Sequence, residues 1–138
     1  MEHLEISTEI GRLDVDVIHR FLSEESYWAR GRAREVVQQC IDNSICFGAY
    51  VAGQQVGFAR VVTDRATFAW LADVFILDDY RGRGYGKTLV AAVLAHPDLQ
   101  GLRRWLLATK DAHGLYAQNG FTPVPPERFM ERLKPQSL

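Results

Sequence analysis

A short run of glycines and cations, residues 81–87, is the part of the sequence best suited to bind a ligand. It reads Arg-Gly-Arg-Gly-Tyr-Gly-Lys and joins an apolar run to a helical pattern. Glycines let the backbone turn tightly and approach a ligand, because they have no Cβ. The first amides of the following helix lack helical partners and lie at the positive end of its dipole. The arrangement predicts a phosphate site, to which Arg81, Arg83 and Lys87 add charge.

Two familiar nucleotide motifs each fail at one position of this loop. A Walker loop, GxxxxGK[ST], needs glycine where Arg81 stands, although residues 86–88 match its end. A dinucleotide fingerprint, GxGxxG, beginning at Gly82 needs glycine directly after Gly86. The pattern that remains is [Gln/Arg]-x-x-Gly-x-[Gly/Ala], with Gly84 at its centre. A pyrophosphate is therefore the expected ligand.

The elements that must position this loop are read from apolar periodicity. A first helix is expected from its cap, Asp14. A second helix is expected to bury Val36, Val37, Cys40 and Ile41. The expected strands cover residues 47–51, 55–62, 68–77 and 103–108. A later helix is expected with Leu89, Val90, Val93 and Leu94 on one face, ending at residues 96–97, and another around residues 112–119. Closely spaced strands followed by a strand–loop–helix–strand unit predict an α+β fold, a mixed sheet with helices on its faces.

Residues 73–86, together with the motif Leu-Tyr-Ala-Gln-Asn-Gly-Phe at residues 115–121, resemble the GCN5-related N-acetyltransferase (GNAT) superfamily. In that family the glycine-rich motif directly follows the fourth strand. The resemblance implies a single N-acetyltransferase domain over residues 1–138. It implies a central, mostly antiparallel sheet that is splayed between strands 4 and 5 and flanked by about four helices. It also implies acetyl-CoA as co-substrate, with no metal.

The resemblance further implies that the pantetheine arm pairs with the backbone of the fourth strand and that the loop amides hold the pyrophosphate. The implied cofactor-binding residues are Val74, Phe75, Ile76, Arg81, Gly82, Arg83, Gly84, Tyr85, Gly86, Lys87 and Thr109. Thr109 stands where many members carry asparagine, and Arg104 lies where they carry glutamate. These two departures leave the corresponding family roles open. The side chains of residues 74–76 equally fit a plain core strand.

The implied reaction is direct attack of a neutral amine on the acetyl thioester. Tyr116 matches the family tyrosine near the sulfur and is the expected general acid, with structural packing as the alternative. Asp73 is the expected base, and by alternation its side chain shares a face with that of Phe75. An ionic contact within the sheet is the alternative role for Asp73. Asp111 and His113 are weaker candidates for the base.

The acceptor amine is expected beside the connection between the first two helices. Carboxylates at Glu24 and Glu25 would attract a cation, and the rings of Tyr27 and Trp28 would hold one. The alternative is a solvated loop with Trp28 packed inward. We expect the acceptor to be a small-molecule or peptide amine.

Size and composition limit the remaining possibilities. The chain has 138 residues, 47% hydrophobic and 24% charged, with a net charge of -1, which gives no reason to expect a nucleic-acid partner. The sequence has neither a signal-peptide pattern nor an apolar run of about 20 residues. Cys40 and Cys46 fit no zinc motif. We expect a cytoplasmic enzyme, monomeric or homodimeric, without a membrane partner.

Two other functions fit parts of the sequence. A non-catalytic acyl-CoA sensor would keep the loop without turnover, although retention of Tyr116 argues against it. A nucleotide-phosphate protein would use residues 86–88.

Overall fold

The computed structural model describes residues 3–135. The chain divides into two compact units, Met1–Ala108 and Thr109–Leu138.

The first unit is built on a five-stranded sheet in the order β1-β2-β3-β4-β5. Its strands are β1 (Leu4–Ser7), β2 (Ile45–Val51), β3 (Gln54–Thr63), β4 (Phe68–Ile76) and β5 (Arg104–Leu106). Neighbours from β1 to β4 are antiparallel, whereas β5 runs parallel to β4. The predicted mixed, mostly antiparallel sheet is confirmed. Strand β1 was not predicted, because only two apolar residues alternate in it.

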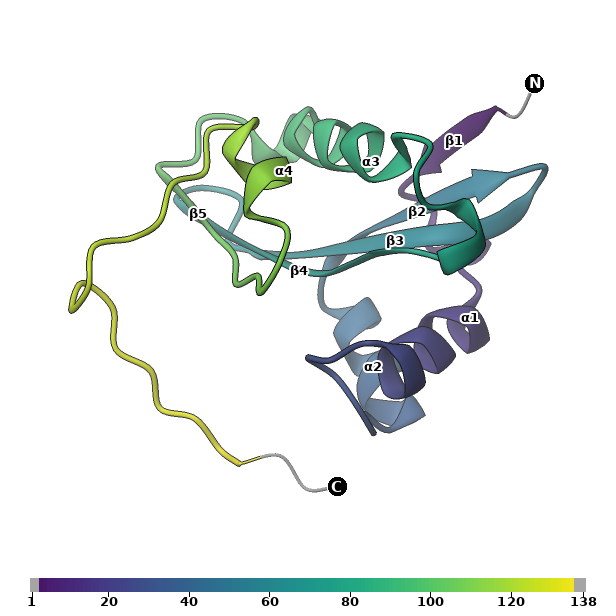
Figure 1. Cartoon of the computed structure of the whole chain (residues 1–138), viewed down its shortest axis with the longest axis horizontal. Helices are drawn as coiled ribbons and strands as arrows, with labels where there is room; N and C mark the ends of the chain where they lie inside the picture. The colour runs from purple at the N-terminus through teal and green to yellow at the C-terminus, as the bar shows by residue number, and fades with distance from the viewer. Residues whose placement is uncertain (1–2, 136–138) are drawn as a thin grey trace. The chain divides into compact units, whose positions relative to one another are not determined.

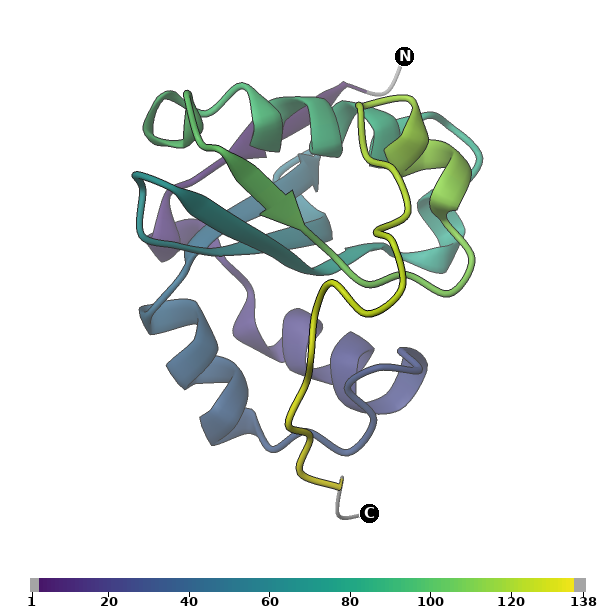
Figure 2. The same cartoon turned by 90° about the vertical axis from the view of Figure 1, so that its left-hand side faces the viewer.

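Helices cover both faces of this sheet, with α3 on one side and α1 and α2 on the other (Figures 1 and 2). Their bounds are α1 (Val15–Arg20), α2 (Arg34–Asp42) and α3 (Tyr85–Leu94). The predicted cap of α1 is confirmed, since an Asp14 side-chain oxygen accepts from the Val17 amide at 3.1 Å. Val36 is 45% exposed, so its predicted place on the buried face of α2 is wrong, whereas Val37 and Ile41, predicted for the same face, are buried.

Helix α1 continues into a wider, π-helical turn over Phe21–Glu25, in which the Ser26 amide donates to the Phe21 carbonyl five residues back. Phe21 and Leu22 in this turn are buried in the cluster between the sheet and α1 and α2. The Phe21 ring stacks on Phe75 of β4, with centroids 4.0 Å apart. Full burial of one such ring stabilises the fold by about 1.5–3 kcal/mol, so this contact holds α1 firmly against β4.

The sheet opens between β4 and β5. Their described pairing covers only three positions, from Phe68 opposite Arg104 to Trp70 opposite Leu106. The rest of β4 still pairs with β3 on its other edge, up to Ile76 opposite Gly57. The predicted splay is confirmed, and it leaves the C-terminal half of β4 unpaired with β5.

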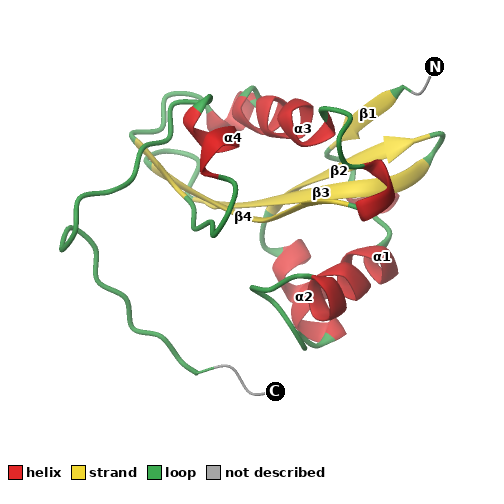
Figure 3. Cartoon of the chain, in the orientation of Figure 1, coloured by secondary structure: helices red, strands yellow, loops and turns green. Residues whose placement is uncertain are grey.

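The second unit contains the short helix α4 (His113–Ala117), followed by loops and turns over residues 121–135 (Figure 3). Its helix ends in a Schellman motif: the Phe121 amide donates to the Tyr116 carbonyl, and the Gly120 amide donates to the Ala117 carbonyl. Gly120 has φ +89°, which this motif requires. The Phe121 ring packs edge-on against Tyr116 at 5.9 Å. Residues 116–121 of the second sequence motif are thus explained as a helix C-cap.

Candidate functional site

Two glycines determine the backbone conformation of the loop between β4 and α3. Gly82 has φ +80° and Gly84 has φ +79°, both in the left-handed region. No heavy atom lies within 4 Å of where a Cβ would stand at either position. Glycine is therefore required there by the backbone conformation, and the space beside both residues is open.

The N-terminus of α3 carries the positive end of its helix dipole. Its first backbone bond runs from the Thr88 amide to the Gly84 carbonyl at 3.1 Å, so the amides of residues 85–87 precede the helical ladder. The first turn of this ten-residue helix contains no acidic residue. Lys87 is exposed in the same turn. An anion placed here would meet both backbone donors and the positive end of the helix dipole.

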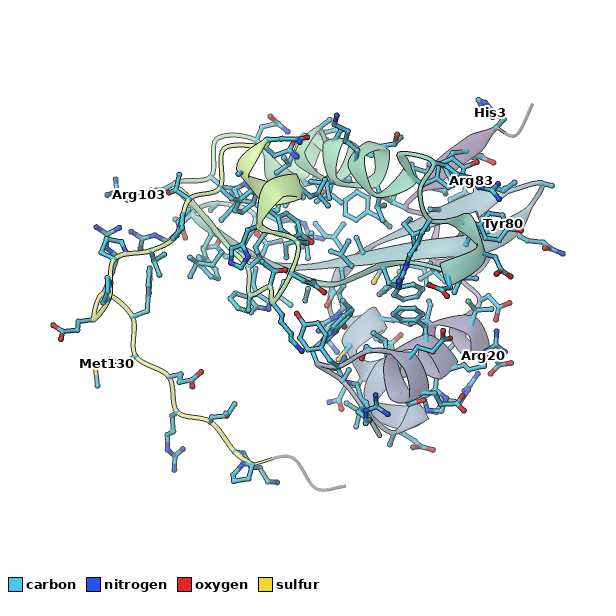
Figure 4. The ribbon with its side chains drawn as sticks, in the orientation of Figure 1. His3, Arg20, Tyr80, Arg83, Arg103 and Met130 are labelled. Atoms are coloured by element: carbon cyan, nitrogen blue, oxygen red, sulfur yellow. The ribbon has the colours of Figure 1, made fainter. Side chains whose placement is uncertain are left out.

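Both arginines of the loop also brace it. Arg81 donates through Nε to the Ile76 carbonyl at 3.0 Å and forms an ion pair with Asp78 at 3.1 Å. Arg83 donates to the Asp79 carbonyl at 3.1 Å, and its guanidinium carbon lies 5.1 Å from the centre of the Tyr80 ring (Figure 4). Part of the predicted cationic charge is therefore used to shape the loop.

A β-bulge shapes β4 just before its C-terminal end. Phe58 of β3 pairs with Phe75, and Arg60 pairs with Ala72, so two residues of β4 lie opposite one of β3. The extra residue in this bulge is accommodated at Asp73, whose φ of +55° lies in the left-handed region. Bulges increase the local twist and re-aim side chains. The bulge begins in the stretch of β4 that has already separated from β5.

The Asp73 carboxylate is the centre of a buried polar cluster. Its side chain is 3% exposed. Oδ1 accepts from Trp28 Nε1 at 2.8 Å, and Oδ2 accepts from Arg60 Nε at 2.8 Å and Arg32 Nη1 at 3.0 Å. The side chain lies among residues of α1 and α2, as does Phe75, so the predicted shared face is confirmed. Three donors already hold this carboxylate, which makes Asp73 a poor candidate for the general base.

The α1–α2 loop, residues 26–33, brings two of these donors to β4. Trp28 packs against the buried cluster, with its ring centre 6.4 Å from that of Phe21, which supports the alternative of an inward-packed Trp28. Tyr27 is 48% exposed, and its ring meets Trp28 edge-on at 5.1 Å. Glu24 and Glu25 are exposed just before this loop. Of the two aromatic residues predicted to bind the acceptor amine, Tyr27 therefore faces solvent, and Trp28 packs beneath it.

Arg32 and Arg60 were missed by the sequence analysis. Arg60 had a detectable signal, because it is a lone cation within the apolar run of β3 and pairs with a carboxylate on the next strand. Arg32 lies in an arginine-rich loop, where nothing in the spacing separates it from its exposed neighbours.

Thr109 and Tyr116 belong to the second unit. The Thr109 hydroxyl oxygen accepts from the Ala112 amide at 3.0 Å, so it caps the turn that leads into α4. Tyr116 lies on α4 in the Schellman motif described above. The predicted roles of these residues toward a cofactor stay predictions.

Over residues 3–135, the helices are all too short or too polar to span a bilayer. Within the same range, His, Cys, Asp and Glu side chains form no group of three or more that would hold a metal ion.

Comparisons with known proteins agree on one family. A family model described as the acetyltransferase (GNAT) domain matches residues 42–123. A solved structure from Xanthomonas campestris pv. campestris, described as a candidate acetyltransferase of the GNAT family, is 57% identical, with a TM-score of 0.94 over 98% of this chain and 96% of that one. A curated relative from Gibberella zeae, described as a candidate acetyltransferase, is 32% identical and covers 83% of this chain and 76% of its own length.

Structures solved with a ligand are among the matches. One of them is described as a candidate acetyltransferase with acetyl-CoA from Clostridium acetobutylicum, and it matches with a TM-score of 0.71 over 96% of each chain. Its sequence identity is 11%, so the similarity shows the fold alone.

Proposed function

The chain belongs to the GNAT acetyltransferase family, and from that premise we propose that it transfers the acetyl group of acetyl-CoA to a primary amine. The acceptor is a small molecule or a peptide, and the reaction is direct attack in a ternary complex.

The observation that carries this proposal is the start of α3. Two left-handed glycines lead into a helix whose first turn has no acidic residue and presents amides that precede the helical ladder. This combination suits a diphosphate, because backbone donors and the helix dipole act on the same anion. Residues 81–87 would then bind the pyrophosphate of coenzyme A.

The splayed edge of β4 supports the second part of the proposal. Residues 74–76 lie beyond the last described pair with β5, at Trp70, and Phe75 and Ile76 retain pairing with β3 on the other side. An extended pantetheine arm carries amides that would pair with such an edge as an added strand would. Arg81 links this edge to the loop through the Ile76 carbonyl.

In the proposed reaction the neutral amine nitrogen attacks the thioester carbonyl carbon, the carbon–sulfur bond breaks, and the nitrogen gives up one proton to solvent. The thiolate of the coenzyme takes up a proton, for which Tyr116 is the proposed donor. A free phenol has a pKa of about 10 and a free thiol about 8.5, so complete transfer is uphill by about 2 kcal/mol without help from the site. A hydrogen bond from Tyr116 to the developing sulfur charge serves the same purpose.

The test combines binding and turnover. Calorimetry should show binding of acetyl-CoA in preference to ATP with Mg²⁺. A thiol-release assay with spermidine, L-lysine, kanamycin and an unblocked peptide as acceptors should show turnover with at least one of them. Tight binding without thiol release from any amine would favour the sensor over the enzyme. Preference for ATP with Mg²⁺ would contradict the loop assignment itself.

A further inference from the structure

The cluster around Asp73 joins two parts of the molecule that would have separate tasks in the proposed reaction. Asp73 and Arg60 lie on neighbouring strands of the sheet, whereas Trp28 and Arg32 lie in the α1–α2 loop. One carboxylate therefore fastens the loop to the strand along which the pantetheine arm is proposed to lie.

We propose that Asp73 is a positioning residue, which holds the α1–α2 loop so that Trp28 presents Tyr27 to the acceptor amine. The proposal rests on the proposed acetyltransferase function. It replaces the role of general base that the sequence had suggested for Asp73.

The geometry separates these two roles. A general base must reach the proton that it removes, directly or through one water. The Asp73 side chain is 3% exposed, and both of its oxygens already accept hydrogen bonds. An incoming amine could approach the carboxylate only by displacing Trp28 or an arginine. That displacement would detach the α1–α2 loop, which is the proposed binding surface for the amine.

Other hydrogen bonds of the loop join its residues to one another and to the turn at the end of α1, whereas the bonds to Asp73 attach it to β4. Ser26 is buried, donates to the Leu22 carbonyl at 2.7 Å and accepts from the Ala29 amide at 3.0 Å. The Gly31 amide donates to the Ser23 carbonyl at 2.9 Å. These bonds set the internal shape of the loop, and the bonds from residues 28 and 32 to Asp73 set its position on the strand.

The effect on the acceptor passes through two aromatic rings. The hydrogen bond from Nε1 fixes the orientation of the Trp28 indole. The Tyr27 ring meets that indole edge-on at 5.1 Å with an interplanar angle of 82°, and it is the more exposed of the two. Aromatic faces hold cationic and amphipathic amines well. Loss of the hydrogen bond would therefore loosen Tyr27 without touching the coenzyme site.

Three substitutions test the role of the Asp73 carboxylate. Asp73→Asn keeps the volume and suits the left-handed backbone, since asparagine is enriched there. Asp73→Gly removes the side chain and relieves the backbone, whose φ is +55°. Trp28→Phe keeps an aromatic ring but removes the Nε1 donor. Asp16→Asn is the matched control, because it breaks the exposed ion pair between Asp16 and Arg34 at 3.1 Å, at the start of α2.

The kinetic constants kcat and KM are measured with those amines, among spermidine, L-lysine, kanamycin and the unblocked peptide, that the wild type acetylates. For both Asp73→Asn and Trp28→Phe, KM for the amine should rise by about tenfold, with kcat changed less than about threefold, as loss of ground-state positioning requires. The affinity for acetyl-CoA should stay within about twofold of the wild type, and the double variant should add little to either single one. Asp16→Asn should leave all three constants unchanged.

The opposite pattern would overturn the proposal. A general base at Asp73 predicts a loss of kcat of about 100-fold or more in both Asp73 variants, at unchanged KM. It also predicts nearly unchanged kcat and KM in Trp28→Phe.

A spectroscopic measurement keeps the test independent of turnover. The indole N–H signal of Trp28 in a ¹H–¹⁵N spectrum is assigned by its loss in Trp28→Phe. It should shift in Asp73→Asn and Asp73→Gly and stay in place in Asp16→Asn. An unmoved signal in the Asp73 variants would contradict the hydrogen bond on which the proposal depends. Absence of turnover in the wild type would instead refute the proposed function and leave this measurement standing.

Discussion

Arg81 donates through Nε to the backbone carbonyl oxygen of Ile76 at 3.0 Å, which joins the glycine-rich loop to the last residue of β4. The same guanidinium pairs with Asp78 in the turn between them. The edge proposed for pantetheine and the loop proposed for pyrophosphate are therefore held at a fixed separation by one side chain. A ligand that spans both segments would depend on that link.

Arg81→Lys should weaken coenzyme A binding although it preserves the charge. Lysine lacks the planar guanidinium that donates to the Ile76 carbonyl and the Asp78 carboxylate at the same time. Loss of one of these hydrogen bonds costs about 1 kcal/mol, which corresponds to a rise in Kd of about fivefold. Calorimetry with coenzyme A measures the change. Arg65→Lys is the control, because Arg65 pairs with the exposed Asp98 in another loop and should leave Kd unchanged. An unaltered Kd in Arg81→Lys would refute the link.

Gly84 and Gly53 form a matched pair for testing the anion site. Both have φ +79°, and both lie in open space. Alanine at either position should lower the free energy of unfolding by about 1–2 kcal/mol, the cost of a left-handed residue with a Cβ. Urea unfolding measures this common loss.

Glutamate at the same two positions should separate them. Gly84→Glu places a negative charge at the N-terminus of α3 and should lower coenzyme A affinity by at least tenfold beyond the alanine variant, because it competes for the same donors. Gly53→Glu, in the hairpin between β2 and β3, should leave that affinity unaffected. Equal affinities in the two glutamate variants would mean that the pyrophosphate lies elsewhere.

The parts of the fold that sequence predicted are those governed by local rules. The cap at Asp14 and the turn at residues 52–54 depend on neighbours in the chain, and both are present. The glycines of the loop were recognisable because positive φ angles restrict residue type. Each of these features needs no knowledge of distant contacts.

The parts that sequence missed depend on contacts between distant residues. Asp73 was placed on the correct face of β4, yet its partners Trp28 and Arg32 lie more than forty residues away in the chain. Alternation along a strand predicts which face of the sheet a side chain lies on, but it does not predict which donors from other elements bond to that side chain. The bulge at Asp73 was equally hidden, because it arises from the register between β3 and β4. For this reason the sequence suggested a base where the structure shows a held carboxylate.

Tyr116→Phe should lower turnover by at least about tenfold and leave coenzyme A affinity nearly unchanged, if the hydroxyl assists the departing thiolate. The ring contact with Phe121 survives this change, so the fold of the second unit should persist. Phe121→Leu is the complementary variant, since it removes the ring contact and keeps the hydroxyl. Steady-state thiol release and calorimetry measure both. A larger loss of turnover in Phe121→Leu than in Tyr116→Phe would assign Tyr116 to packing.

Tyr50→Phe should stabilise the protein. Among residues 3–135, the buried Tyr50 hydroxyl has no hydrogen-bond partner, and burial raises the pKa of this phenol. A buried polar group without a partner costs about 1–3 kcal/mol, so removal of the oxygen should raise the free energy of unfolding by about 1 kcal/mol. The contact between Arg12 and the ring, at 4.2 Å, is retained with phenylalanine. Urea unfolding is the measurement, and a destabilised variant would reveal a hydrogen bond to water.

Cys46 should make stability fall at alkaline pH. Burial raises the pKa of its thiol to about 12 in the folded chain, whereas an unfolded thiol ionises near pH 8.5. Above that pH the unfolded state releases a proton that the folded state keeps, so each further unit of pH costs up to about 1.4 kcal/mol until the folded pKa is reached. Urea unfolding at pH 8, 9 and 10 measures the slope, and Cys46→Ala isolates it from other groups. The difference in unfolding free energy between the wild type and Cys46→Ala should shrink as pH rises, and a constant difference would mean that Cys46 reaches solvent.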